Sequence, residues 1–312
     1  MTNRIESRLL QGAPNPAPRL IEIVGPNPGP CVALLGGIHG DEDEGVLSVR
    51  RVVAMLRDRP IAGTVRAVAT SNPAACDAYA RCTPGDGQNL ARVFPGSRHG
   101  SYTERTAFAI TQRVLKGSQA LIDLHSGGCD LAMPLFCGYH EDHNRSGTGS
   151  AALARAFGAP LTWAHMSLSQ GRSLSAAHSL GIPAIYAEAS GGREVRGGEM
   201  DAFVEGILNV LRFLGSLPEA AKPTSSRLIR DPGGDTDAGL VAPATGTWVT
   251  RCPVGSLVGK GDLLAEIYND DGCRTAMLTA PRAGIVMMLR RHSRVTEGTS
   301  VAIVAAEPEE WR

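Results

Sequence analysis

The sequence predicts an α/β fold followed by a smaller β-rich domain. Through residue 215, apolar strand-like runs alternate with segments whose apolar residues recur every three or four positions. This alternation predicts strands connected by helices and a sheet that is at least partly parallel. Residues 215–227 form a linker by composition, and beyond them short strands are separated by glycine turns. We therefore expect two domains, residues 1–215 and residues 228–312.

The expected elements of the first domain follow in chain order, beginning with an edge strand at residues 20–24 and a buried strand at residues 31–35. Later strand patterns lie at residues 65–70, 119–124, 131–139 and 182–188, and helical spacing occurs at residues 46–56, 103–115, 150–157, 174–180 and 203–214. We expect Asp41 or Asp43 to cap the first helix, because short acidic side chains accept hydrogen bonds from the free amides there. Residues 72–101 are irregular, and loops of this length are usually functional or disordered.

The C-terminal segment contains two similar halves. Residues 242–246 (Ala-Pro-Ala-Thr-Gly) recur as residues 280–284 (Ala-Pro-Arg-Ala-Gly). This repeat of short strands is similar to the barrel-sandwich hybrid of biotinyl and lipoyl carrier domains. Those carriers present a lysine on the hairpin between the halves, but here residues 269–272 read Asn-Asp-Asp-Gly. We therefore do not expect a carrier function.

The composition excludes several classes of partner. The formal net charge is zero, so charge does not support binding to nucleic acid or to an anionic membrane. No apolar run reaches the length of about 18 residues that a membrane span needs, and the first residues lack the apolar core of a signal peptide. The seven cysteines are scattered, which favours free thiols. We expect a cytoplasmic protein.

Two strand ends carry candidate metal ligands. After the strand at residues 31–35, two glycines lead to His39 and Glu42, and His125 follows a second apolar strand. In open α/β sheets, ligands bind at the carboxyl ends of strands, and imidazole with carboxylate is a common zinc ligand set. A lone histidine at a strand end is more often structural, but two such ends with a glutamate at this offset favour a metal. Cys129 is close to His125, and we interpret it as a small buried hydrophobe.

Other polar residues suit hydrolytic chemistry. Glu188 ends an apolar strand, where an idle acid would be costly to bury, so it is a candidate base for a metal-activated water. A solvated strand-end acid is the alternative interpretation of Glu188. The irregular segment carries Arg81, Arg92 and Arg98, and a guanidinium binds carboxylates or stabilises an oxyanion, although most loop arginines are merely solvated. Asp123 could orient the imidazole of His125 or cap a backbone amide.

These residues resemble those of the succinylglutamate desuccinylase/aspartoacylase family, a branch of the zinc carboxypeptidase-like hydrolases. The resemblance rests on five motifs in family order: G-I-H-G-D-E at residues 37–42, N-P at 72–73, D-G-Q-N-L-A-R-V-F-P-G at 86–96, D-L-H-S-G-G at 123–128, and Glu188. It covers about residues 30–215, and the β-rich tail is also usual in this family. The resemblance implies a mixed sheet flanked by helices, as in zinc carboxypeptidases.

The resemblance also assigns roles to individual residues. It implies that one zinc ion (Zn2+) per chain is bound by three metal ligands: His39, Glu42 and His125. Glu188 is then the general base and acid, and Arg81 polarises the carbonyl group of the substrate. Arg92 matches the arginine that grips the substrate carboxylate, and we expect Asn89 and Ser126 to contact the substrate as well. One position departs from the family, because Ala91 replaces the asparagine that commonly precedes this arginine.

The implied function is a zinc-dependent amidohydrolase that cleaves the amide bond of a small anionic N-acylated amino acid, of N-acetyl or N-succinyl type. Members of similar length include deacetylases of N-acetylated diamino acids. We expect the C-terminal domain to narrow access to the site. The sequence leaves open whether the protein forms a homo-oligomer. Two alternatives remain: a metallocarboxypeptidase acting on peptide C-termini, and a non-catalytic protein that binds a small acid in the same pocket.

Overall fold

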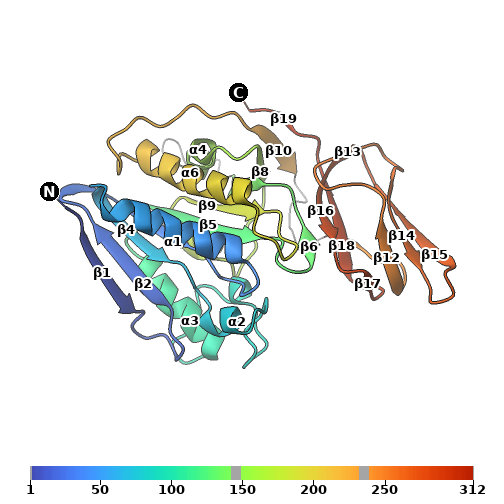
Figure 1. The fold of residues 1–312 in the computed structure, drawn as a ribbon, viewed down its shortest axis with the longest axis horizontal. Helices are drawn as coiled ribbons and strands as arrows, with labels where there is room; N and C mark the ends of the chain where they lie inside the picture. Colours follow the sequence, from blue (N-terminus) through green and yellow to red (C-terminus); the bar gives the residue numbers. More distant parts are fainter. Residues whose placement is uncertain (1, 142–148, 232–238, 312) are drawn as a thin grey trace.

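The computed structural model describes residues 2–141, 149–231 and 239–311. Figure 1 shows a large mixed sheet with helices on its two faces, and two small C-terminal sheets that lie beyond one end of it. This arrangement agrees with the predicted α/β class and with a β-rich C-terminal part.

The large sheet has ten strands, whose order differs from the order along the chain. In spatial order they are β1 (Arg4–Leu9), β2 (Arg19–Val24), β4 (Ala62–Val68), β3 (Asn27–Leu35), β5 (Ala120–Ser126), β9 (Ala184–Ala189), β7 (Phe136–His140), β8 (Leu161–His165), β10 (Arg227–Asp231) and β19 (Glu309–Glu310). The central strands β4, β3, β5 and β9 are mutually parallel, whereas β7 runs antiparallel to β9. The carboxyl ends of β3, β5 and β9 therefore lie at one edge of the sheet.

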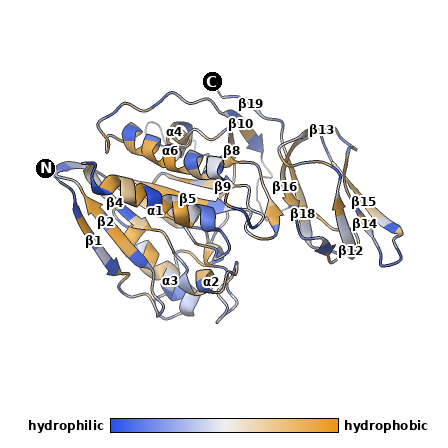
Figure 2. Cartoon of the chain, in the orientation of Figure 1, coloured by the Kyte–Doolittle hydropathy of each residue, from blue (hydrophilic) through white to orange (hydrophobic). Residues whose placement is uncertain are grey.

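Helices cover both faces of this sheet because the strands are apolar on both sides. The helical segments are α1 (Asp43–Arg57), α2 (Pro73–Asp77), the 3-10 turn η1 (Leu90–Arg92), α3 (Tyr102–Ile110) with its π-helical continuation η2 (Thr111–Leu115), α4 (Ser150–Phe157), α5 (Ser173–Ser179) and α6 (Gly197–Phe213). Apolar residues of α1, α4 and α6 form one core with the sheet, and those of α3, η2 and α5 form the other. Figure 2 shows hydrophobic residues concentrated along the central strands. The result is a three-layer domain.

Several sequence predictions need correction. Residues 20–24 belong to β2, which is not an edge strand, because β1 pairs with its outer side. Charged residues alternate along β1, so this strand carries no apolar signal. Neither predicted aspartate caps α1: its N-cap is Glu42, whose side chain makes no capping bond, and the Asp41 carboxylate accepts from the backbone N–H of Cys129. The strand expected at residues 131–139 is split between two sheets, as β6 (Leu131–Ala132) and β7.

Two further differences concern elements of the first domain. Strand β8 was not predicted from the sequence, because its pattern is short and contains polar residues. Helix α6 begins at Gly197, six residues before the predicted start, because its first turns carry glycines and polar residues that lack an apolar stripe.

The C-terminal part consists of two small sheets. One comprises β11 (Leu240–Val241), β18 (Ser300–Ala305), β16 (Gly284–Arg290) and β13 (Leu257–Val258), with β6 added to β16; the other comprises β15 (Arg274–Thr279), β14 (Leu263–Tyr268), β12 (Gly246–Thr250) and β17 (Arg294–Val295). Residues of both sheets share one apolar core. The predicted division at residues 215 and 228 remains a proposal, and the pairing shows that β10 and β19 extend the large sheet.

Candidate active site

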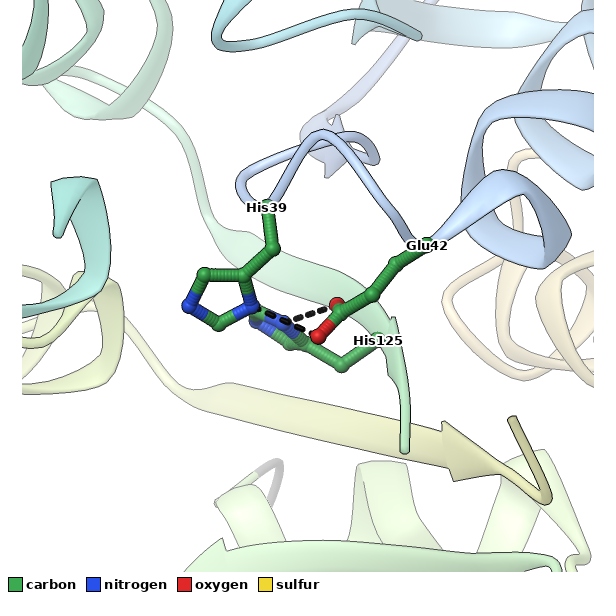
Figure 3. Close-up of side chains that lie close together, drawn as sticks. All are labelled: His39, Glu42 and His125. Atoms are coloured by element: carbon green, nitrogen blue, oxygen red, sulfur yellow. Dashed lines mark hydrogen bonds and ion pairs between the residues drawn. The ribbon is translucent and has the colours of Figure 1, made fainter. Parts of the chain in front are cut away.

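The three predicted metal ligands converge at the edge of the large sheet. His39 and Glu42 lie in the turn between β3 and α1, and His125 lies near the end of the adjacent strand β5. One ligand atom from each residue lies within 4.8 Å of the other two, and all three side chains are buried. Figure 3 shows both imidazole rings directed at the carboxylate of Glu42. The predicted cluster therefore exists as a geometric unit.

Hydrogen bonds on the far side of each imidazole determine which nitrogen faces Glu42. The Nε2 atom of His39 donates to Asn89 Oδ1 at 3.0 Å, and Nε2 of His125 lies 3.1 Å from the carboxylate oxygen of Asp123. Since both partners are acceptors, both Nε2 atoms carry a hydrogen, and each ring, when it is neutral, presents the lone pair of Nδ1 to Glu42. The suggested role of Asp123, orienting the ring of His125, fits this contact.

The facing atoms are suited to a cation. The Nδ1 atoms of His39 and His125 lie 2.7 Å and 3.0 Å from the two carboxylate oxygens of Glu42. An imidazole lone pair and a carboxylate oxygen repel each other at this separation unless a proton or a metal ion lies between them. Two nitrogen donors and one carboxylate oxygen, each with a supporting hydrogen bond, are a donor set that zinc accepts.

The electrostatics of the cluster also favour a cation. Burial by itself would lower the pKa of His125, but the carboxylates of Asp123 and Glu42 raise it well above its ordinary value. Burial opposes the charge of Glu42 as well, yet His39 and His125 hold the pKa of this carboxyl well below its usual range. Arg81 donates from Nη1 to the same carboxylate at 3.0 Å. Glu42 is therefore an anion near neutral pH.

Glu188 lies on the strand next to His125. The two residues are register partners on the parallel strands β5 and β9, so their side chains point to the same face of the sheet. The Oε2 atom of Glu188 is shielded from solvent and has no hydrogen-bond partner among the described residues. Burial raises the pKa of Glu188 to about 8, although the positive charges of His125 and Arg81 oppose this. A buried carboxyl group with a raised pKa in a pocket is a candidate functional residue.

A pocket of about 120 Å³ connects these groups. Its wall includes the imidazoles of His39 and His125, the carboxyl groups of Asp123 and Glu188, and three guanidinium groups, those of Arg81, Arg92 and Arg172. The volume is below the roughly 300–1,000 Å³ that is typical of sites for drug-sized ligands. The pocket therefore suits a small molecule that carries negative charge.

Comparison with known proteins places this site in a family. The model of the succinylglutamate desuccinylase/aspartoacylase catalytic domain matches residues 28–214, which contain all the groups described above. The chain belongs to the succinylglutamate desuccinylase/aspartoacylase family. This confirms the resemblance found in the sequence. A similar protein is the N-alpha-acetyl-L-2,4-diaminobutyric acid deacetylase of Halomonas elongata, which is 30% identical over 294 residues, covering 91% of this chain and 84% of that protein.

Solved structures of similar proteins share the whole fold. The product-bound ectoine utilization protein EutE (DoeB) from Ruegeria pomeroyi has a TM-score of 0.87 at 26% identity, covering 97% of this chain and 94% of that chain. The succinylglutamate desuccinylase/aspartoacylase from Rhodobacter sphaeroides has a TM-score of 0.85 at 25% identity, covering 100% and 96%. Because coverage is nearly complete, the C-terminal part belongs to the shared architecture in these structures.

The three residues predicted to contact the substrate, Arg92, Asn89 and Ser126, have different surroundings. Arg92 lines the pocket, and so does the neighbouring residue Ala91. Asn89 contacts His39, and its Oδ1 also accepts from the backbone N–H of Ala91. Ser126 lines the pocket, but its hydroxyl donates to Glu44 at 2.8 Å. Contact of Asn89 and Ser126 with a substrate therefore remains a prediction.

The C-terminal part does not line the pocket, and narrowing of the entrance by this part remains a prediction. Every described residue of the pocket wall lies between Ile38 and Glu188. The contribution of the C-terminal part is indirect, because β16 pairs with β6, whose Leu131 is part of the wall. Among the described segments, no helix combines the length and apolarity that a membrane span requires.

The sequence analysis missed several residues of the wall, including His140, His165, Arg172 and Tyr186. Tyr186 could have been found, because it lies two positions before Glu188 on a predicted strand and so shares its face. His165 lies on β8, which was not predicted. Arg172 lies in the loop before α5, and nothing in the local sequence indicates that it contributes to the pocket wall.

Gly171 fixes the loop that carries Arg92. It has a φ of +81°, and a Cβ atom there would lie 2.2 Å from the backbone oxygen of Arg92. The backbone N–H of Phe94 donates to the Gly171 carbonyl at 2.9 Å. We expect Gly171→Ala to displace Arg92 and to raise KM about tenfold with a smaller change in kcat. Steady-state kinetics with an N-acetyl amino acid measures this change.

A matched control separates displacement of Arg92 from general strain. Gly63 has a φ of +82°, and a Cβ there would lie 2.0 Å from the Pro30 oxygen, far from the pocket in the fold. Gly63→Ala should lower thermal stability without raising KM. An unchanged KM in Gly171→Ala, or an equal rise in both variants, would contradict the positioning role.

Proposed function

We propose that this protein is a zinc-dependent hydrolase that removes the acyl group from a small anionic N-acylated amino acid. The proposal is carried by one observation: the ligand atoms of His39, Glu42 and His125 converge within 4.8 Å, beside the shielded carboxyl group of Glu188. The family match and the named deacetylase relative support it. We assign the three converging residues as ligands of one zinc ion, and a zinc ion bound there would supply Lewis-acid chemistry.

The residues of the chain supply the remaining steps. Glu188 accepts a proton from the attacking water, and its position among apolar strand residues makes it basic enough to do so near neutral pH. The same carboxyl group then donates this proton to the departing nitrogen. Arg81, which is held by Glu42, presents a guanidinium to the oxygen of the carbonyl group under attack. Arg92 binds the carboxylate of the amino acid through its planar fork.

The named relative favours a short acyl group. That protein is a deacetylase, so we propose acetyl rather than succinyl. Nα-acetyl-2,4-diaminobutyrate, named for the relative, is the first substrate to test. We further propose a cytoplasmic location, a barrel-sandwich-like C-terminal part, and a boundary between two units near residues 215–228.

A direct assay compares the three candidate functions. The zinc-loaded protein is incubated with N-acetyl amino acids, with N-succinyl amino acids and with short peptides, and release of acetate, succinate and C-terminal residues is measured. The proposal expects acetate release, with kcat/KM for the peptides lower by at least about 100-fold. Faster release of C-terminal residues would identify a carboxypeptidase. Tight binding of N-acetyl amino acids without any turnover would identify a binding protein.

A further inference from the structure

The carboxylate of Asp123 has a second partner besides the imidazole of His125. The two residues lie two positions apart on β5, so their side chains point to the same face of the sheet. The Oδ2 atom of Asp123 lies 3.1 Å from Nε2 of His125 and also accepts a hydrogen bond from the hydroxyl of Ser173, the first residue of α5. The roles proposed above do not use Ser173.

Packing holds Ser173 in this place. Helix α5 covers the face of β5 that carries Asp123, because Ala176 and Ala177 of the helix belong to the same apolar core as Leu121 of the strand. Ser173 is 4% exposed and Asp123 is 1% exposed. The hydrogen bond therefore joins two packed elements whose contacting residues are 50 positions apart in the chain.

Two donors on one oxygen fix the orientation of this carboxylate. The terminal torsion of an aspartate side chain is broad, so a carboxylate with a single partner can rotate and exchange its two oxygens. The other oxygen of Asp123, Oδ1, is shielded from solvent and has no hydrogen-bond partner among the described residues. The hydroxyl of Ser173 therefore selects the orientation in which Oδ2 faces His125.

We propose that Ser173 is a positioning residue for the metal site, because it holds Asp123 in the orientation that aims the ring of His125 at the metal ion. This inference rests on the proposed function, in which His125 is a zinc ligand. A hydrogen bond at Nε2 leaves Nδ1 of the neutral ring available to a metal and sets the plane of the ring. Nδ1 of His125 lies 3.0 Å from a carboxylate oxygen of Glu42 (Figure 3). The contacts thus run without a break from α5 to the ligands.

The affinity for zinc tests this role without any assay of turnover. The metal-free protein is titrated with zinc against a chromophoric chelator, and the Kd for zinc of Ser173→Ala is compared with that of the wild type. Loss of a group that supports a metal ligand typically weakens metal binding by 10- to 100-fold. Ser173 acts one contact further out, so we expect a rise in Kd of about tenfold, at the lower end of this range.

A double-mutant cycle shows whether Ser173 acts through Asp123. Asp123→Ala removes the direct partner of His125 and should raise the Kd for zinc by up to about 100-fold. Ser173→Ala, added to Asp123→Ala, should change the Kd by less than about twofold, because the hydroxyl then has no carboxylate to hold.

Ser118→Ala is the matched control. It also removes a buried serine hydroxyl, which donates to the backbone oxygen of Val114. Ser118 lies two residues before the start of β5, at the end of this strand opposite His125. Whatever this substitution costs in thermal stability, it should leave the Kd for zinc within about twofold of the wild-type value.

Several results would overturn the positioning role: an unchanged Kd in Ser173→Ala, an equal rise in Ser118→Ala, or full additivity with Asp123→Ala. A rise in KM for an N-acetyl amino acid with an unchanged Kd for zinc would assign Ser173 to the substrate instead. A wild type that binds no zinc refutes the proposed function, and the inference fails with it. A wild type that binds zinc and releases acetate, beside a Ser173→Ala of equal zinc affinity, contradicts only the inference.

Discussion

Glu188→Gln should lower kcat by about 10²- to 10⁴-fold, with little change in KM. The amide is nearly isosteric with the carboxyl group but cannot accept the proton of the attacking water, and general acid–base catalysis contributes an effect of this size. Glu188 lines the same pocket as the metal ligands, and the substitution preserves the shape of its side chain. Substrate binding should therefore be retained. Measurement of kcat and KM with the preferred N-acetyl amino acid checks this expectation.

The pH profile and a control variant make the assignment of Glu188 specific. A carboxyl group acts as a base only after losing its proton, so wild-type kcat should rise with pH through the pKa of Glu188, and Glu188→Gln should lose that rise. A bound divalent cation lowers this pKa below the value of about 8 that burial produces. Glu266→Gln alters another buried carboxylate, in the C-terminal sheets, and should leave kcat unchanged. Full turnover by Glu188→Gln would remove the proposed base.

Removal of the metal should abolish activity and also reduce stability. Dialysis against a strong chelator would remove a zinc ion held by His39, Glu42 and His125, so activity should fall to the background and return on addition of zinc. A ligand at 100 times its Kd stabilises a fold by about 2.7 kcal/mol, which for a chain of this size lowers the melting temperature by several degrees when it is lost. Differential scanning calorimetry and acetate release measure the two effects. Undiminished turnover in the chelator would contradict metal dependence.

The reactive centre was more predictable than its surroundings. His39 and Glu42 are three positions apart in one turn, and His125 and Glu188 each end a run of apolar residues, so local sequence and the geometry of parallel strands bring them together. The supporting contact between Asp123 and His125 follows from the same strand, because residues two apart share a face.

The arrangement of His165 and Tyr186 in the pocket wall could not be predicted from local patterns. His165 lies on the short strand β8, and no local pattern indicates that this strand pairs with β7. Tyr186 crosses β7 only because position 138 is a glycine without a side chain. These features depend on strand order, which periodicity does not reveal. For the same reason, local patterns could not predict that β10 and β19, near the end of the chain, pair with the large sheet.

The metal content of the purified protein tests the central claim most directly. Elemental analysis of the wild type, of Glu42→Gln and of Glu188→Gln should give about one zinc ion per chain in the first and third proteins and much less in the second, because Glu42 is one of the three proposed ligands and Glu188 is not. A wild type that binds no divalent metal after incubation with zinc would contradict the account. So would a zinc content that is the same in wild type and in a folded Glu42→Gln.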